Sequence, residues 1–403
     1  MHELFRSQRR LVRGTDLSSF DRCVVTFDSY SEELRFELKG FGEEFFASHG
    51  IAAIHVLSRE NDWYQHEEMA DIVAAVRRAT RGVGRIMTYG SSMGGYAAIR
   101  FAEALGAHAA LALSPQYSVD GAKVPFERRW REEGRRIRYR DEIDGPIRAR
   151  MRPVIAFDPT GVDRLHVDRI AADIDIIRVS VPFSGHPVGT TLSEARLLTP
   201  LVLRTLDGTL DAEALAREFR ARRSSLANYF GELARRQPPV RPRLRIALAR
   251  RGVALAPDHP LPQHLLAAAL TDAGELEEAL PIHRRIVDEM ERRPVYVLGF
   301  SDALLRAGRY DEAVEMVGRS VAAAPDTAWF HRLLAHVHDV RGDLAGALAS
   351  IRRASTLDPA NREYRRSARK LKAAILLDKV MPAPPRPDGK LAGIRRRLAV
   401  RRP

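Results

Sequence analysis

The sequence predicts an α/β domain, a mostly parallel sheet with helices on both faces, followed by an all-α domain of helical repeats. Three observations support this prediction. Apolar strand-like runs alternate with helical runs as far as about residue 205. One of these strands leads through Gly90-Ser91-Ser92-Met93-Gly94 directly into a helical run. After about residue 206 the strand-like runs cease, and a short pattern recurs three times at a fixed interval.

Length and composition indicate a globular protein of more than one domain. The chain has 403 residues, of which 45% are hydrophobic, and a single compact domain is seldom this long. No apolar run approaches the roughly 20 residues that cross a bilayer, and the first residues lack the apolar core of a signal peptide. Cys23 is the only cysteine, which excludes an internal disulfide and a cysteine metal site. We expect a cytoplasmic protein without a metal or another cofactor.

The chain is strongly basic. Its net charge is +13, and most of the excess is arginine. A positive field attracts nucleic acid, anionic polysaccharide or an anionic membrane surface. The sequence has neither a basic strand interleaved with aromatic residues nor zinc-finger spacing, so we expect no specific nucleic-acid binding. An arginine-rich solvated surface accounts for the charge.

The strands of the first half are predicted from runs of apolar residues. These runs lie at residues 22–27, 51–57, 84–89, 109–114, 153–157 and 174–181. Helical patterns separate most of them, at 41–47, 67–80 and 96–105 among others. Continuous apolar runs are typical of parallel strands that are buried on both faces. Ligands on such a sheet bind outside the carboxyl ends of the strands, and this rule selects the candidate site residues.

Ser92, Asp158 and His186 each fall just beyond a predicted strand. Ser92 is the central residue of G-x-S-x-G, at a sharp turn where a side chain in place of either glycine, Gly90 or Gly94, would not fit. Ser91 does not qualify, because the pattern would then require glycine at Tyr89 and Met93.

Other residues compete for two of these roles. Asp163 remains an alternative to Asp158, whereas Asp168 falls within a predicted helix and should face solvent. His66 also follows a strand and is the rival of His186.

Residues 20–205 resemble the α/β-hydrolase family. The features that carry the resemblance are G-x-S-x-G and the order Ser, Asp, His in which the three candidate residues follow one another along the chain. The resemblance implies that Ser92 is the nucleophile, His186 the general base, and Asp158 the carboxylate that orients the histidine. Imidazole suits the role of base because it titrates near neutral pH. The expected activity is that of a serine esterase acting on a small-molecule or glycan ester or thioester through an acyl-enzyme. Acyl transfer to a sugar hydroxyl, or deacetylation of a glycan, is an alternative.

The resemblance also implies an oxyanion hole of backbone N–H groups. One donor would be Met93, the residue after the nucleophile. The other would come from the turn after the first predicted strand, at Asp28 or Ser29, where the His-Gly-Gly-Gly of lipases is absent. Trp63 and Tyr64 follow another strand and are candidates for the pocket lining.

Residues 115–150 interrupt the alternation of strands and helices, and an insertion at this point often forms a lid in the family that the domain resembles. Residues 128–140 contain seven arginines and two glutamates. They form either a surface that selects an anionic or polyhydroxylated substrate or an exposed arginine-rich helix.

The second half contains a repeat of 34 residues. The spacing is seen at Gly274, Gly308 and Gly342, and again at Ala279, Ala313 and Ala347. This period and these residue types resemble the tetratricopeptide repeat (TPR), in which the glycine ends one helix and the small alanine lets the next helix pack closely. The resemblance implies a groove that binds a protein partner.

The predicted domain boundaries follow from these patterns. Residues 1–205 form the α/β domain, 206–242 a helical linker or degenerate first repeat, and 243–380 the repeats. The segment 381–403 is rich in proline and arginine and is predicted to be a disordered basic tail, with weak contact to an anionic surface as an alternative. A second hypothesis for the whole chain is a catalytically inactive adaptor whose repeats carry the function.

Overall fold

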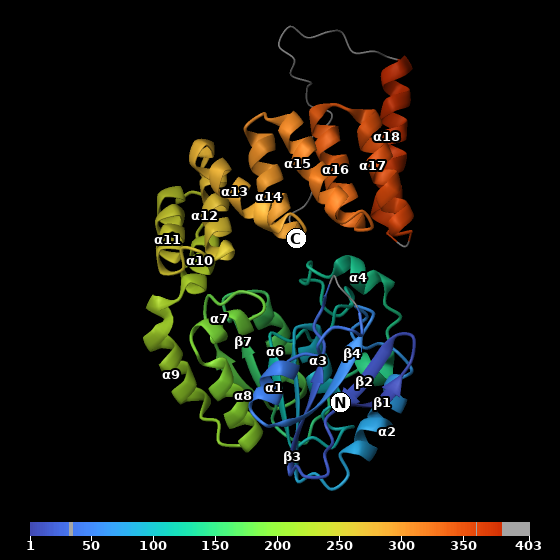
Figure 1. Ribbon diagram of the computed structural model, residues 1–403, viewed down its shortest axis with the longest axis vertical. Helices are drawn as coiled ribbons and strands as arrows, with labels where there is room; N and C mark the ends of the chain where they lie inside the picture. Colours follow the sequence, from blue (N-terminus) through green and yellow to red (C-terminus); the bar gives the residue numbers. More distant parts are fainter. Residues whose placement is uncertain (32–34, 360, 381–403) are drawn as a thin grey trace. The chain divides into compact units, whose positions relative to one another are not determined.

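The computed structural model describes residues 1–31, 35–359 and 361–380 (Figure 1). The chain divides into two compact units, Met1–Glu232 and Leu233–Pro403. The first unit therefore extends past the expected end of the α/β domain at residue 205. The reason is packing: Leu206, Leu215, Phe219 and Leu226 complete the core on one face of the sheet.

The first unit is built on one sheet with the strand order β1-β2-β4-β3-β5-β6-β7-β8. Strand β2 is antiparallel to both of its neighbours, and all pairs from β4 to β8 are parallel. The strands are β1 (His2–Arg6), β2 (Arg10–Gly14), β3 (Arg22–Phe27), β4 (Ala52–Ser58), β5 (Arg85–Ser91), β6 (Ala109–Leu113), β7 (Val154–Phe157) and β8 (Ile177–Ser180). The six strands expected from the sequence are present, and β1 and β2 are additional.

Helices cover both faces of the sheet. Alternate residues of β3 show this: Val24 belongs to a buried cluster that includes residues of α1, α7, α8 and α9, whereas Val25 belongs to one that includes residues of α2 and α3. The helices are α1 (Glu43–Ser48), α2 (Met69–Ala79), α3 (Met93–Arg100), α4 (Arg131–Arg136), α5 (Asp141–Asp144), α6 (Asp163–Asp173), α7 (Gly189–Glu194), α8 (Leu198–Asp207), α9 (Ala212–Arg222) and α10 (Ala227–Arg235), with a short 3₁₀ turn at Arg223–Ser225.

The register of the parallel strands brings their carboxyl ends to one edge. Phe27 lies opposite Gly90, Ser91 opposite Leu113, and Phe157 opposite Ser180. The loops that follow β3, β5, β6, β7 and β8 therefore begin side by side, as expected for a parallel sheet.

The second unit consists of consecutive antiparallel helices (Figure 1). They are α11 (Pro242–Leu255), α12 (Pro260–Ala273), α13 (Leu276–Met290), α14 (Pro294–Arg306), α15 (Tyr310–Ala323), α16 (Ala328–Arg341), α17 (Leu344–Leu357) and α18 (Arg362–Val380).

The 34-residue spacing has a direct structural basis. Gly274, Gly308 and Gly342 follow α12, α14 and α16 with φ values of 83°, 72° and 93°, in the left-handed region that glycine adopts freely. The alanines at 279, 313 and 347 are fully buried where consecutive helices meet. Among the described helices, none has the length and apolar character needed to span a bilayer. The proposed basic tail, 381–403, lies outside the described residues.

Candidate active site

Ser92 occupies a strained turn between β5 and α3. Its φ and ψ are 53° and −116°, a conformation that non-glycine residues rarely adopt. A Cβ at Gly90 would lie 2.2 Å from the carbonyl oxygen of Gly94, and one at Gly94 would lie 2.3 Å from that of Phe27. Both glycines of the G-x-S-x-G pattern are thus required by close backbone approach.

Ser92, His186 and Asp163 form a hydrogen-bonded chain. Ser92 Oγ lies 2.9 Å from His186 Nε2, and His186 Nδ1 lies 2.8 Å from Asp163 Oδ2. Because a carboxylate accepts hydrogen bonds, Nδ1 carries the proton and Nε2 is left to accept the serine hydroxyl. The ring therefore stands in the tautomer that a general base requires.

The carboxylate at His186 is Asp163 and not Asp158, which corrects the assignment made from the sequence. Asp158 accepts hydrogen bonds from the backbone N–H groups of Phe183 and Gly185, at 3.1 and 3.0 Å. It therefore ties the loop that carries His186 to the end of β7. Asp163 is the first residue of α6, in the segment that follows β7, and its side chain reaches the imidazole.

A buried charge network extends from Asp163 into the insertion. Arg129 Nη2 lies 2.8 Å from Asp163 Oδ1 and 2.7 Å from Glu127 Oε2, and Glu127 also contacts His166 Nε2 at 2.9 Å. Burial opposes ionisation of Asp163, but the hydrogen bond to His186 and the charge of Arg129 hold the pKa of Asp163 below its usual value. Burial likewise opposes ionisation of Glu127, and His166 and Arg129 lower the pKa of that carboxyl to about 2. Both carboxylates are therefore ionised at neutral pH.

Of the three expected oxyanion donors, one is already hydrogen-bonded within the protein. The N–H of Asp28 donates to the carbonyl of Val56 at 3.3 Å, so it belongs to the sheet and is not free for a ligand. Within the described part of the chain, the N–H groups of Met93 and Ser29 have no acceptor. Ser29 lies against the turn at Ser92, because its hydroxyl donates to the carbonyl of Ser91 at 2.9 Å. Met93 and Ser29 remain as the candidate pair.

Tyr64 supports one of these donors and does not line a pocket. It is fully buried, with its ring against Phe27 and Phe101. Its hydroxyl donates to the carbonyl of Asp28 at 2.9 Å. That carbonyl and the N–H of Ser29 belong to one planar trans peptide and point in opposite directions. Tyr64 therefore fixes the direction in which the N–H of Ser29 points.

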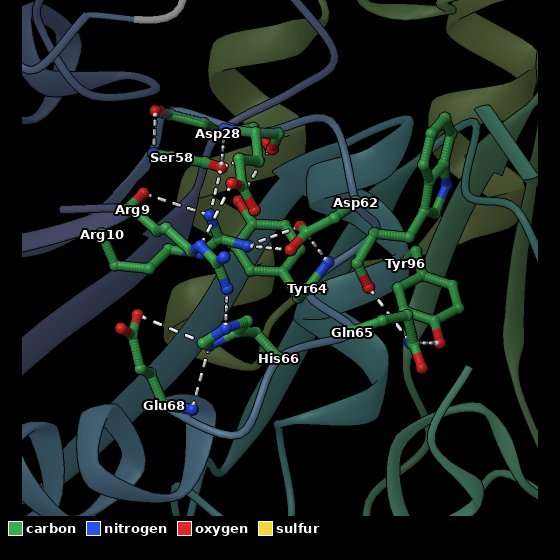
Figure 2. Close-up of polar contacts among 12 residues, drawn as sticks. Arg9, Arg10, Asp28, Ser58, Asp62, Tyr64, Gln65, His66, Glu68 and Tyr96 are labelled. Atoms are coloured by element: carbon green, nitrogen blue, oxygen red, sulfur yellow. Dashed lines mark hydrogen bonds and ion pairs between the residues drawn. The ribbon is translucent and has the colours of Figure 1, made fainter. Parts of the chain in front are cut away.

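The loop after β4 is held by a buried arginine (Figure 2). Arg10 is fully buried, lies 2.6 Å from Asp62 Oδ2 and 2.8 Å from Ser58 Oγ, and stands over the ring of Tyr64. Asp62 in turn accepts the backbone N–H of Tyr64 at 3.0 Å. These contacts stabilise positive φ angles of 51° at Trp63 and 60° at Tyr64.

His66 belongs to the same loop and does not take part in the triad. Its Nδ1 accepts the backbone N–H of Glu68 at 3.2 Å, and its Nε2 contacts Arg9 (Figure 2). Asp168 pairs with Arg164 and Arg178 at the surface, as expected for a residue on the exposed side of its helix.

The insertion packs directly onto His186. The Trp130 ring centroid lies 6.3 Å from that of His186, 4.6 Å from Tyr30 and 5.6 Å from Trp63. Trp63 is 1% exposed, so it packs within this cluster and presents almost no surface to a ligand. Of the arginines in this segment, Arg129 is committed to the network around Asp163, while Arg135 and Arg140 pair with Glu132 and Glu142.

Sequence reasoning missed Arg129 and Gln116. Gln116 follows the end of β6 and is 1% exposed. Its Nε2 lies 3.2 Å from Ser92 Oγ. The rule that selected Ser92 and His186, proximity to a strand end, also applies to Gln116. Arg129 lies inside the insertion, where no strand end marks it.

Comparison with known proteins identifies the repeat. The tetratricopeptide repeat family matches residues 270–337. This match confirms the TPR-type repeat that the 34-residue spacing predicts. No curated protein matches the chain.

Several solved structures are similar to part of the chain. They include a thermophilic TPR protein of Thermus thermophilus, with 19% identity, 37% of this chain and 82% of that chain covered, and a TM-score of 0.31. YrrB, a TPR protein with an unusual peptide-binding site, has 18% identity, coverages of 44% and 88%, and a TM-score of 0.32. MamA of Desulfovibrio magneticus has 17% identity, coverages of 39% and 97%, and a TM-score of 0.29.

Proposed function

We propose that the first unit is a serine hydrolase that cleaves an ester or thioester through an acyl-enzyme on Ser92. One observation carries the proposal: the unbroken chain of hydrogen bonds from Ser92 through His186 to Asp163, at 2.9 and 2.8 Å. The parallel strands from β3 to β8 support it, because a mostly parallel sheet is what the resemblance to α/β-hydrolases implies.

In the first half of the reaction, Ser92 Oγ attacks the carbonyl carbon of the substrate. The hydroxyl proton passes to His186 Nε2, and Asp163 stabilises the imidazolium that results. Negative charge develops on the carbonyl oxygen, where the N–H groups of Met93 and Ser29 would donate to it. The intermediate collapses as the bond to the leaving alcohol or thiol breaks, and the leaving group takes the proton from His186.

In the second half, a water molecule attacks the acyl carbon and gives its proton to His186. The bond between the acyl carbon and Ser92 Oγ then breaks, Oγ regains a proton from His186, and the carboxylic acid departs. A sugar hydroxyl in place of water would give acyl transfer to a glycan by the same steps. The proposed substrate is a small-molecule or glycan ester or thioester.

A fluorophosphonate probe tests the proposal on the full-length protein. The wild type should be labelled, and Ser92→Ala should not. Asp163→Asn should lower both labelling and ester hydrolysis by about 10⁴-fold, as expected when the imidazole is held in the wrong tautomer. Hydrolysis by Ser92→Ala at the rate of the wild type would contradict the proposal. Transfer is distinguished from hydrolysis by adding a sugar acceptor and measuring the acylated sugar.

The repeats favour a second, compatible function, which is binding of a protein or peptide partner. The supporting observation is the TPR family match at residues 270–337. If this function is independent of catalysis, full-length Ser92→Ala should retain the partner, whereas Ala313→Arg should lose it because a charge replaces a fully buried alanine. Loss of the partner in Ser92→Ala would argue against a separate adaptor role.

A further inference from the structure

Gln116 is the polar side chain of the insertion that touches the nucleophile. Its side chain makes three polar contacts. Oε1 accepts the indole N–H of Trp63 at 3.1 Å, and Nε2 lies 3.2 Å from Ser92 Oγ and 3.4 Å from the carbonyl oxygen of Ser114. The side chain thus bridges two loops at the carboxyl edge of the sheet.

These contacts fix which end of the amide faces Ser92. The indole N–H of Trp63 can only donate, so the atom opposite it must be the amide oxygen. The carbonyl of Ser114 can only accept, so the atom opposite it must be the amide nitrogen. A flipped amide would lose both contacts at once. The NH₂ group is therefore a donor that is held permanently toward Ser92.

Trp63 is itself held firmly. It is 1% exposed, and it has a positive φ in the loop that Arg10 and Asp62 stabilise (Figure 2). Its ring packs against Tyr30 and Trp130. The orientation of the Gln116 amide therefore depends on a side chain that cannot easily turn away.

We propose that Gln116 is a catalytic residue that donates a hydrogen bond to Ser92 Oγ, and that Trp63 is the positioning residue that keeps its amide correctly oriented. This inference rests on the proposed hydrolase function. In the resting site the amide occupies one lone pair of Oγ and leaves the hydroxyl hydrogen directed at His186. When the acyl–Oγ bond breaks in the second half-reaction, negative charge grows on Oγ, and the same N–H stabilises it.

The test uses full-length protein, a chromogenic acetate ester and a fluorophosphonate probe. Gln116→Met keeps the length of the side chain and removes its donors. We expect kcat to fall about tenfold, which is the rate equivalent of one net hydrogen bond. Fluorophosphonate labelling, which reports only the attack by Ser92, should change less. Trp63→Phe keeps a ring and removes the N–H, so kcat should fall about three- to tenfold.

The double variant separates positioning from general damage. If Trp63 acts through the amide, Trp63→Phe should have no further effect on kcat in the Gln116→Met background. Gln263→Met is the matched control, because Gln263 is another buried glutamine, bonded to Pro257 and Arg285 in the second unit. That variant should leave kcat unchanged.

Three results distinguish failure of the role proposed for Gln116 from failure of the proposed hydrolase function. Unchanged kcat in folded Gln116→Met, or fully additive losses in the double variant, would overturn the role of Gln116 while leaving the hydrolase intact. Absence of labelling in the wild type would instead overturn the proposed function itself. If Gln116→Met does not fold, Gln116→Glu replaces it, since an ionised carboxylate still accepts from Trp63 but cannot donate to Ser92; it should be at least as slow.

Discussion

Replacing Arg129 by methionine should move the acid limb of the pH–rate profile to higher pH. Arg129 lies 2.8 Å from Asp163 Oδ1, while His186 lies 2.8 Å from Asp163 Oδ2. The guanidinium and the imidazole thus share one carboxylate. A positive charge beside Asp163 disfavours a second positive charge on the imidazole, and catalysis requires the neutral imidazole as base.

The size of the shift follows from Coulomb's law. Two unit charges on the order of 7 Å apart interact by about 2 kcal/mol at an effective dielectric constant of about 20. This corresponds to between one and two pH units. The sign is fixed, since removing Arg129 stabilises the imidazolium, so the base remains protonated to higher pH. The pKa of Asp163 should also rise toward its usual value, because the charge of Arg129 helps to lower it.

The assay is kcat/KM for a chromogenic ester measured between about pH 5 and 9 on wild type and variants. Arg128→Met is the matched control: it removes the same charge from the adjacent residue, which is exposed. Its profile should coincide with that of the wild type, whereas Arg129→Lys should lie between the wild type and Arg129→Met.

A folded Arg129→Met protein with an unshifted profile would refute the electrostatic reasoning. So would an equal shift in Arg128→Met, because the effect would then come from net charge and not from the contact with Asp163. Arg129→Met should also lower the free energy of unfolding by about 3 kcal/mol, since it leaves two buried carboxylates with one partner fewer.

Three other predictions concern support and packing. Tyr64→Phe should lower kcat about tenfold and the free energy of unfolding by about 1 kcal/mol, because it removes the hydrogen bond that holds the Asp28–Ser29 peptide; unchanged kcat would show that the peptide is held without the hydroxyl. Burial raises the pKa of Asp28 to about 6, so the stability that this group contributes is present below about pH 4 and lost as the pH rises through 6. Asp28→Asn should remove that dependence, about 3 kcal/mol in denaturant titrations, and parallel curves for the two proteins would contradict this. Ala313→Leu should destabilise the second unit by about 1–3 kcal/mol and leave ester hydrolysis unchanged; lost hydrolysis would contradict the separation of the two units.

The parallel strands could be predicted because both of their faces are buried and their sequences are continuously apolar. The two strands that were missed, β1 and β2, contain charged residues. Arg10 in β2 is fully buried, but only because Asp62, 52 positions away, neutralises it. A sequence pattern cannot register a partner so distant along the chain.

The candidate site likewise contains residues that the sequence marks and residues that only the path of the chain determines. Ser92 and His186 are marked by strand ends and are brought together as expected. Asp158 is closest to its strand end, yet its carboxylate accepts hydrogen bonds from the backbone N–H groups of Phe183 and Gly185 and not from His186. Only the path of the chain from β7 into α6 determines that Asp163 reaches the imidazole. The repeats were easier, because each glycine and alanine acts within its own helix pair.

The way in which the insertion meets the triad has a consequence for redesign. Residues 115–150 supply Gln116 at the nucleophile, Arg129 at the carboxylate and Trp130 beside the imidazole. Swapping this segment for an unrelated loop would therefore remove contacts to Ser92, Asp163 and His186, which form the proposed reaction centre. A graft that aims to change selectivity should keep these three side chains and vary the exposed arginines that follow them, such as Arg131 and Arg138.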